Sequence, residues 1–146
     1  LLQSGWPEGP TRPVSPEEDL PWADYTPVHI PKGASPATVA AEIALMKPGV
    51  VLSNTARGGV VCEKALSEAL ASGHVGAAGL DVFDDEPPES SSPLLSQFNT
   101  VLSPHIAGLT TECGERMAIA SIQNAVNYLK GTIDPGLIVN PEFAHV

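Results

Sequence analysis

The chain has 146 residues, enough for one domain, and 42% of them are hydrophobic, which suffices for a packed core. Its formal net charge of -10 and isoelectric point near 4.6 argue against a broad basic surface, so we expect no nucleic acid and no membrane as partner. Its two cysteines, Cys62 and Cys113, suit neither a disulfide framework nor a paired metal site. With no signal-like segment or long apolar run in the sequence, we expect a reducing, cytoplasmic location.

Predicted strands and helices alternate along the chain after a proline-rich lead-in over residues 1–22, in which the stretch 5–18 has no helical or strand period. The predicted strands cover residues 24–29, 50–53, 77–82 and 100–103, and the predicted helices cover residues 36–46, 62–72 and 111–130. Alternation of this kind predicts βαβ crossovers and a parallel sheet, hence an α/β fold.

Polar motifs follow the last three predicted strands. In chain order they are Asn54–Gly59 (NTARGG), Leu80–Pro87 (LDVFDDEP) and Ser103–Gly108 (SPHIAG). They bring Arg57, Glu86 and His105 just past the strand ends. Because ligands bind at the carboxyl edge of open α/β sheets, we expect these side chains to lie close together.

The three residue types suit the reduction of an acid that carries a carbonyl group. An arginine can hold a carboxylate through two parallel hydrogen bonds. A glutamate beside a histidine orients the imidazole and favours its protonated form, which makes a general acid/base. Side chains cannot supply a hydride, whereas a nicotinamide cofactor can. Taken singly, each residue also fits a plainer role: Arg57 a surface ion pair, Glu86 a solvated acidic loop, and His105 a structural histidine.

On these motifs the chain resembles the D-isomer-specific 2-hydroxyacid dehydrogenases, and among them the D-3-phosphoglycerate dehydrogenase-like branch. The resemblance runs from about Trp22 to Glu142. It implies a partial doubly wound, Rossmann-like parallel sheet over residues 23–110, which is the second half of the cofactor domain. Residues 111–146 would form a long helix and a tail that return toward a substrate domain.

The resemblance also implies roles for single residues. Arg57 would bind the carboxylate and carbonyl of a 2-keto acid, Glu86 would pair with His105, and His105 would exchange a proton with the substrate oxygen. The positions implied for NAD or NADP binding are Pro31, Thr55, Ala56, Arg57, Asp81, His105 and Gly108. No metal is implied.

One departure from the family limits these expectations. The Gly-x-Gly-x-x-Gly turn and the acidic ribose ligand that follows it are not found before Asn54. We therefore expect a C-terminal fragment of the enzyme, with the choice between NAD and NADP and the identity of the acid both open. The resemblance implies a homodimer for the full-length form, and the oligomeric state of this chain stays open.

Two other functions remain open at this point. The C-terminal-binding corepressors share the fold and the same three residues, so a non-catalytic, NAD-sensing binding module is one alternative. A truncated gene product without activity of its own is the other.

Overall fold

The computed structural model describes residues 14–29, 40–140 and 142. The chain divides into two compact units, Leu1–Ile106 and Ala107–Val146, and each is described by itself. The predicted cofactor position Pro31 and the start of the helix predicted over residues 36–46 lie outside the described residues.

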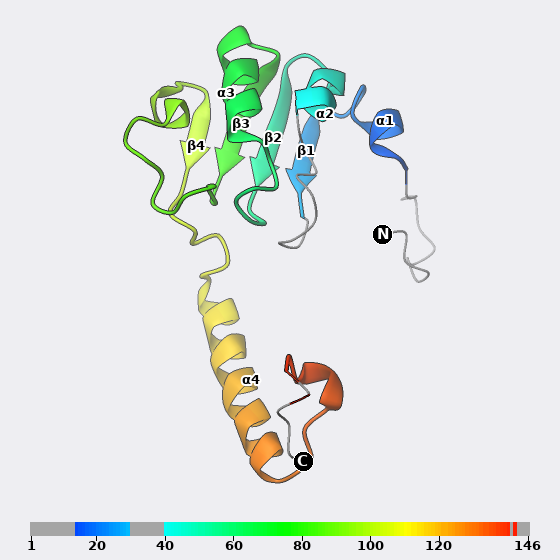
Figure 1. Ribbon diagram of the computed structural model, residues 1–146, viewed down its shortest axis with the longest axis vertical. Coiled ribbons are helices and arrows are strands. Elements are labelled where there is room, and N and C mark those ends of the chain that lie inside the picture. Colours follow the sequence, from blue (N-terminus) through cyan, green and yellow to red (C-terminus); the bar gives the residue numbers. More distant parts are fainter. Residues whose placement is uncertain (1–13, 30–39, 141, 143–146) are drawn as a thin grey trace. The chain divides into compact units, whose positions relative to one another are not determined.

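The first unit is built on a parallel sheet whose strands follow the chain order β1-β2-β3-β4 (Figure 1). The strands are β1 (Tyr25–Val28), β2 (Val50–Asn54), β3 (Val75–Leu80) and β4 (Thr100–Leu102). Asn54, Leu80 and Leu102 are register partners, so β2, β3 and β4 end at the same level of the sheet. The predicted α/β fold with a parallel sheet is confirmed.

One short helix precedes β1, and the other short helices connect the strands. They are α1 (Pro16–Asp19), α2 (Ala40–Leu45), α3 (Glu63–Ser72) and the 3-10 turn η1 (Pro93–Ser96). The apolar face of α3 packs on the sheet, where Leu66 of the helix and Leu52 and Val75 of the strands are fully buried. Gly73 ends α3 in the left-handed conformation, with φ +78°, as its place after the helix predicts.

β3 and α1 differ from the prediction by more than one residue at an end. β3 begins two residues earlier than expected and ends at Leu80, because neither β2 nor β4 continues past the partners of Leu80. Asp81 therefore belongs to the loop that follows. Helix α1 lies in a region predicted to lack periodic structure, where Ser15 and Glu18 form a capping box, each side chain accepting from the other's backbone N–H.

The second unit consists of helix α4 (Thr111–Leu129) and the 3-10 turn η2 (Pro135–Leu137). Thr110 caps α4, since its hydroxyl accepts a hydrogen bond from the Cys113 amide at 3.1 Å. The helix agrees with the predicted range to within one residue at its end. Among the described residues, no helix combines the length and apolarity that crossing a bilayer requires.

The sheet face that carries the side chains of Tyr25, Val51 and Val101 generates a prediction. These side chains are 57%, 41% and 76% exposed, although parallel sheets are normally covered on both faces. The 146-residue chain alone should therefore elute above its monomer mass of 15.1 kDa in size exclusion with light scattering. Val51→Thr with Val101→Thr, which keeps the β-branched shape, should shift the chain toward monomer. A clean monomer with a sharp thermal transition would contradict this expectation.

Candidate active site

The three loops that leave β2, β3 and β4 enclose a pocket of about 540 Å³ in the first unit. Its lining residues are Arg57, Gly58, Gly59, Phe83, Asp84, Glu86 and His105. The structure thus brings the three residues that the sequence marks as catalytic candidates to a single pocket at the carboxyl edge of the sheet. This edge is where ligands bind in open α/β folds.

Glu86 and His105 form a direct pair within the pocket. The His105 Nδ1 atom lies 2.8 Å from Oε2 of Glu86, and the two side chains are 45% and 39% exposed. An ionised carboxylate can only accept, so Nδ1 carries the proton in this contact and Nε2 is the ring nitrogen available to a ligand. The other carboxylate oxygen accepts the Phe83 amide at 3.2 Å. The hydrogen bond from His105, and then the one from Phe83, hold the pKa of Glu86 below its ordinary value.

The backbone around His105 is held in an uncommon conformation. His105 has φ +56°, in the left-handed region that residues other than glycine seldom adopt. The buried carboxylate of Asp81, at the end of β3, accepts hydrogen bonds from the Ser103 hydroxyl at 2.5 Å and the Ile106 amide at 2.9 Å. These bonds join the residues on either side of His105 to the sheet, which is how such a conformation persists.

The loop that carries Arg57 is organised by Asn54, the last residue of β2. Asn54 is 3% exposed, its Nδ2 donates to the Arg57 carbonyl at 3.1 Å, and its Oδ1 accepts from the Ala56 amide at 3.0 Å. The Arg57 side chain is exposed at the pocket, with Nη1 donating to the Ala56 carbonyl at 2.6 Å.

Gly58 lets the loop carrying Arg57 pack against the loop carrying Glu86. A Cβ atom at Gly58 would lie 1.8 Å from the Phe83 carbonyl oxygen, so no other residue fits. Gly59, with φ +75°, makes the turn that follows, and its amide donates to Asp84 Oδ1 at 2.6 Å. The close approach at Gly58 is therefore between two loops of the protein.

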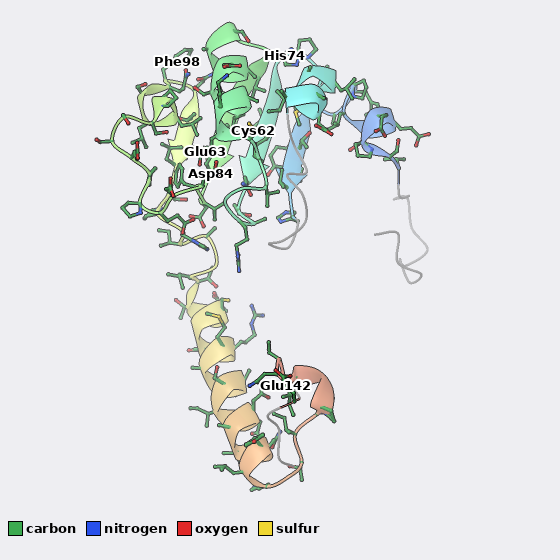
Figure 2. All side chains as sticks on the ribbon, in the orientation of Figure 1. Cys62, Glu63, His74, Asp84, Phe98 and Glu142 are labelled. Carbon is green, nitrogen blue, oxygen red and sulfur yellow. The ribbon has the colours of Figure 1, made fainter. Side chains whose placement is uncertain are left out.

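Glu63, at the start of α3, contacts the loop that carries Asp84 (Figure 2). The Asp84 amide donates to Glu63 Oε1 at 2.7 Å. Burial raises the pKa of the Glu63 carboxyl, against the lowering effect of that hydrogen bond, and the negative charges of Asp84 and Asp85 raise it further. Cys62 occupies the N-cap position of α3, and its side chain makes no hydrogen bond to the helix.

The remaining predicted cofactor positions are spread over both units. Thr55 and Ala56 lie in the loop after β2, and Asp81 is buried beneath the turn of His105. Gly108 belongs to the second unit. Asn54 was not among the predicted site residues. The one indication in the sequence is its position directly after a predicted buried strand, because an asparagine side chain in a turn often hydrogen-bonds the backbone two residues further along the chain.

A family comparison agrees with this geometry. Residues 7–107 match the family model described as "D-isomer specific 2-hydroxyacid dehydrogenase, NAD binding domain". The chain belongs to this family. The matched D-isomer specific 2-hydroxyacid dehydrogenase domain includes the whole sheet and the loops of Arg57, Glu86 and His105. The resemblance inferred from the three motifs is confirmed.

Individual relatives carry related names. Glyoxylate/hydroxypyruvate reductase B of Enterobacter sp. (strain 638) is 46% identical over 101 residues, which are 69% of this chain and 31% of that protein. D-3-phosphoglycerate dehydrogenase of Archaeoglobus fulgidus is 40% identical over 75% of this chain and 21% of its own length. The crystal structure of D-lactate dehydrogenase from Aquifex aeolicus, complexed with NAD and lactic acid, aligns with a TM-score of 0.73 and 31% identity over 82% of this chain and 41% of that one.

The chain thus spans about a third of the length of the Enterobacter reductase. We define the completed protein as this chain joined to the segments of the Enterobacter reductase that have no counterpart in it, and the predictions for the site refer to this protein.

Within the described residues, no group of three or more His, Cys, Asp or Glu side chains is placed to hold a metal ion.

The lowered pKa of Glu86 generates a prediction for the completed protein. In His105→Ala the pKa of Glu86, followed by carboxyl-carbon NMR, should rise toward its ordinary value of 4.5, while the Phe83 amide keeps part of the lowering. A lowered carboxyl pKa stabilises the fold above pH 4.5, and that stabilisation is lost as pH falls through the lowered value. The parent should therefore lose stability more steeply than the variant below pH 4.5.

Glu112 is the matched control, because its pKa is lowered by its own backbone amide and by Thr110, and should not change in His105→Ala. An unchanged Glu86 pKa in the variant would show that the pair does not form in solution.

Proposed function

We propose that this chain supplies the catalytic part of the cofactor domain of an NAD(P)-dependent dehydrogenase, which interconverts a D-2-hydroxy acid and a 2-keto acid. The observation that carries the proposal is the 2.8 Å contact between Glu86 and His105 in the pocket that Arg57 also lines. One pocket thus combines an oriented proton donor with an exposed cation, as reduction of a carbonyl group next to a carboxylate requires.

Arg57 is proposed to anchor the substrate. Its guanidinium can bind a carboxylate with two parallel hydrogen bonds, which fixes both the position and the plane of the acid. The other charged groups on the pocket wall include the carboxylates of Asp84 and Glu86, which repel an anion. An acid is therefore drawn to the Arg57 side of the pocket that His105 also lines.

His105 is proposed to move the proton. Because Glu86 holds the Nδ1–H, Nε2 of the protonated ring can give its proton to the substrate oxygen during reduction and take it back during oxidation. Glu86, ionised over a wider pH range because of its lowered pKa, keeps the ring oriented through both directions. The carbonyl carbon gains a hydride and its oxygen gains a proton, so the keto acid becomes the hydroxy acid.

The residues at the pocket fit the nicotinamide end of NAD or NADP. A bound nicotinamide supplies the hydride for reduction and accepts it in the reverse direction. The pocket of about 540 Å³ is within the usual size for such sites, and we propose that Thr55, Ala56 and Asp81 line the cofactor together with Pro31 and Gly108. The Aquifex dehydrogenase, whose structure holds NAD and lactic acid, supports this placement by its similar fold.

The wider organisation of the protein is part of the same proposal. We take residues 1–22 as a lead-in, 23–110 as the half cofactor domain and 111–146 as the segment that returns to a substrate domain. The free thiols of Cys62 and Cys113 support a reducing, cytoplasmic location. A homodimer through the cofactor domains is proposed for the full-length form.

The completed protein should reduce glyoxylate or hydroxypyruvate with NADH or NADPH. His105→Ala should lower kcat about a hundredfold or more, because it removes the general acid. Arg57→Lys keeps the charge but loses the planar fork; the lost charge-assisted hydrogen bond costs about 1.5–3 kcal/mol. That cost corresponds to a kcat/KM for the keto acid that is lower by roughly tenfold to over a hundredfold.

Lys47→Ala serves as the control, since Lys47 makes an exposed ion pair with Asp24, and its kinetics should match the parent. An Arg57→Lys variant within twofold of the parent would return Arg57 to a surface role. A completed protein that binds the cofactor but reduces neither acid would favour the non-catalytic binding module.

A further inference from the structure

We propose that Asn54 is a positioning residue that aims Arg57 at the substrate carboxylate. This inference rests on the proposed function, because Arg57 must first be the carboxylate anchor. Asn54 does not line the pocket itself. It acts through the loop that starts at its own backbone and carries Arg57 three residues further on.

Asn54 is firmly fixed to the sheet. It pairs with Leu80 as the last residue of β2, and its carbonyl accepts the Asp81 amide at 3.0 Å. Its side chain is 3% exposed, so its conformation is set by packing as well as by hydrogen bonds. The orientation of its carboxamide is therefore set by the sheet and not by the residues that line the pocket.

Both polar atoms of the Asn54 carboxamide form hydrogen bonds to the backbone of the loop. Oδ1 accepts the Ala56 amide at 3.0 Å and Nδ2 donates to the Arg57 carbonyl at 3.1 Å. These two bonds hold the peptide group before Ala56 and the peptide group after Arg57. The two-residue segment from Ala56 to Arg57 is thus fixed at both ends, which restricts the direction in which the Arg57 side chain leaves the backbone. A long arginine side chain loses less conformational freedom on binding when its starting direction is fixed.

Asparagine is well matched to this task. The loop requires one acceptor and one donor in a single planar group, and a buried group with a net charge would be costly. An ionised aspartate at this position keeps the acceptor but turns a carboxylate oxygen toward the Arg57 carbonyl oxygen. A protonated aspartate offers both an acceptor and a donor, so it reproduces the asparagine pattern.

This difference defines the test in the completed protein. Asn54→Asp should raise the KM for the keto acid about tenfold or more at neutral pH, with the KM for the nicotinamide cofactor within twofold of the parent. As pH falls, burial favours the protonated carboxyl of the variant, and the keto acid KM should return toward that of the parent. A role limited to packing predicts no such recovery, since the two side chains have the same shape.

Asn99→Asp is the matched control. The Asn99 Nδ2 donates to the carbonyls of Leu70 and Gly76, at 3.5 and 3.1 Å, away from the residues that line the pocket. The substitution removes the same kind of donor from the same unit. It should lower thermal stability and leave the keto acid KM within twofold of the parent.

Backbone hydrogen exchange provides a readout that does not depend on turnover. The Ala56 amide should exchange at least tenfold faster in Asn54→Leu, which loses the acceptor, and should stay protected in Asn54→Asp, which keeps it. Equal Ala56 exchange in all three proteins, or a keto acid KM in Asn54→Asp equal to that of the parent at neutral pH, would overturn the proposal. A completed protein that reduces no keto acid would contradict the proposed function. Independently of turnover, an unchanged exchange rate of the Ala56 amide in Asn54→Leu would contradict the role of Asn54 in fixing the loop.

Discussion

The parallel register of β2, β3 and β4 is the constraint on which the site depends. Asn54, Leu80 and Leu102 pair across the sheet, and backbone hydrogen bonds continue one residue further, from Asp81 to Asn54 and from Ser103 to Leu80, at 3.0 and 2.9 Å. The three loops therefore start from one level of a rigid scaffold. A slip of one residue in any pairing would turn that strand's buried side chains to the opposite face, so burial also protects the alignment of the loops.

Buried polar groups then convert this alignment into a site. Asn54 and Asp81, each 3% exposed, stand at the ends of neighbouring strands and hold the loops of Arg57 and His105. Gly58 allows the loop after β2 to touch the Phe83 carbonyl of the next loop. The proposed chemistry thus lies on exposed side chains, whereas their positions are determined by residues that a ligand need not touch. This division is common where loops on a rigid scaffold carry function.

Much of this arrangement could be predicted from the sequence, because apolar runs bounded by glycine and proline mark the strands and helices. The end of β3 could not, since apolar residues resume at Val82 after the single charged Asp81, whereas the pairing of β3 with its neighbours stops at Leu80. Helix α1 depends on a local capping box at Ser15, which gives no periodic signal. The grouping of Arg57, Glu86 and His105 followed from strand order. The roles of Asn54 and Gly58 did not. Asn54 acts through hydrogen bonds within its own loop, which leave no periodic signal, and Gly58 acts through a contact between two loops.

The most direct test of the account is a crystal structure of the completed protein with NADH and oxamate, an unreactive analogue of a 2-keto acid. The account predicts the oxamate carboxylate on the Arg57 guanidinium through two parallel hydrogen bonds. The neighbouring oxygen should lie within hydrogen-bond distance of His105 Nε2, with the contact from Nδ1 to Glu86 retained. Oxamate bound without Arg57, or a His105 ring turned away from Glu86, would contradict it.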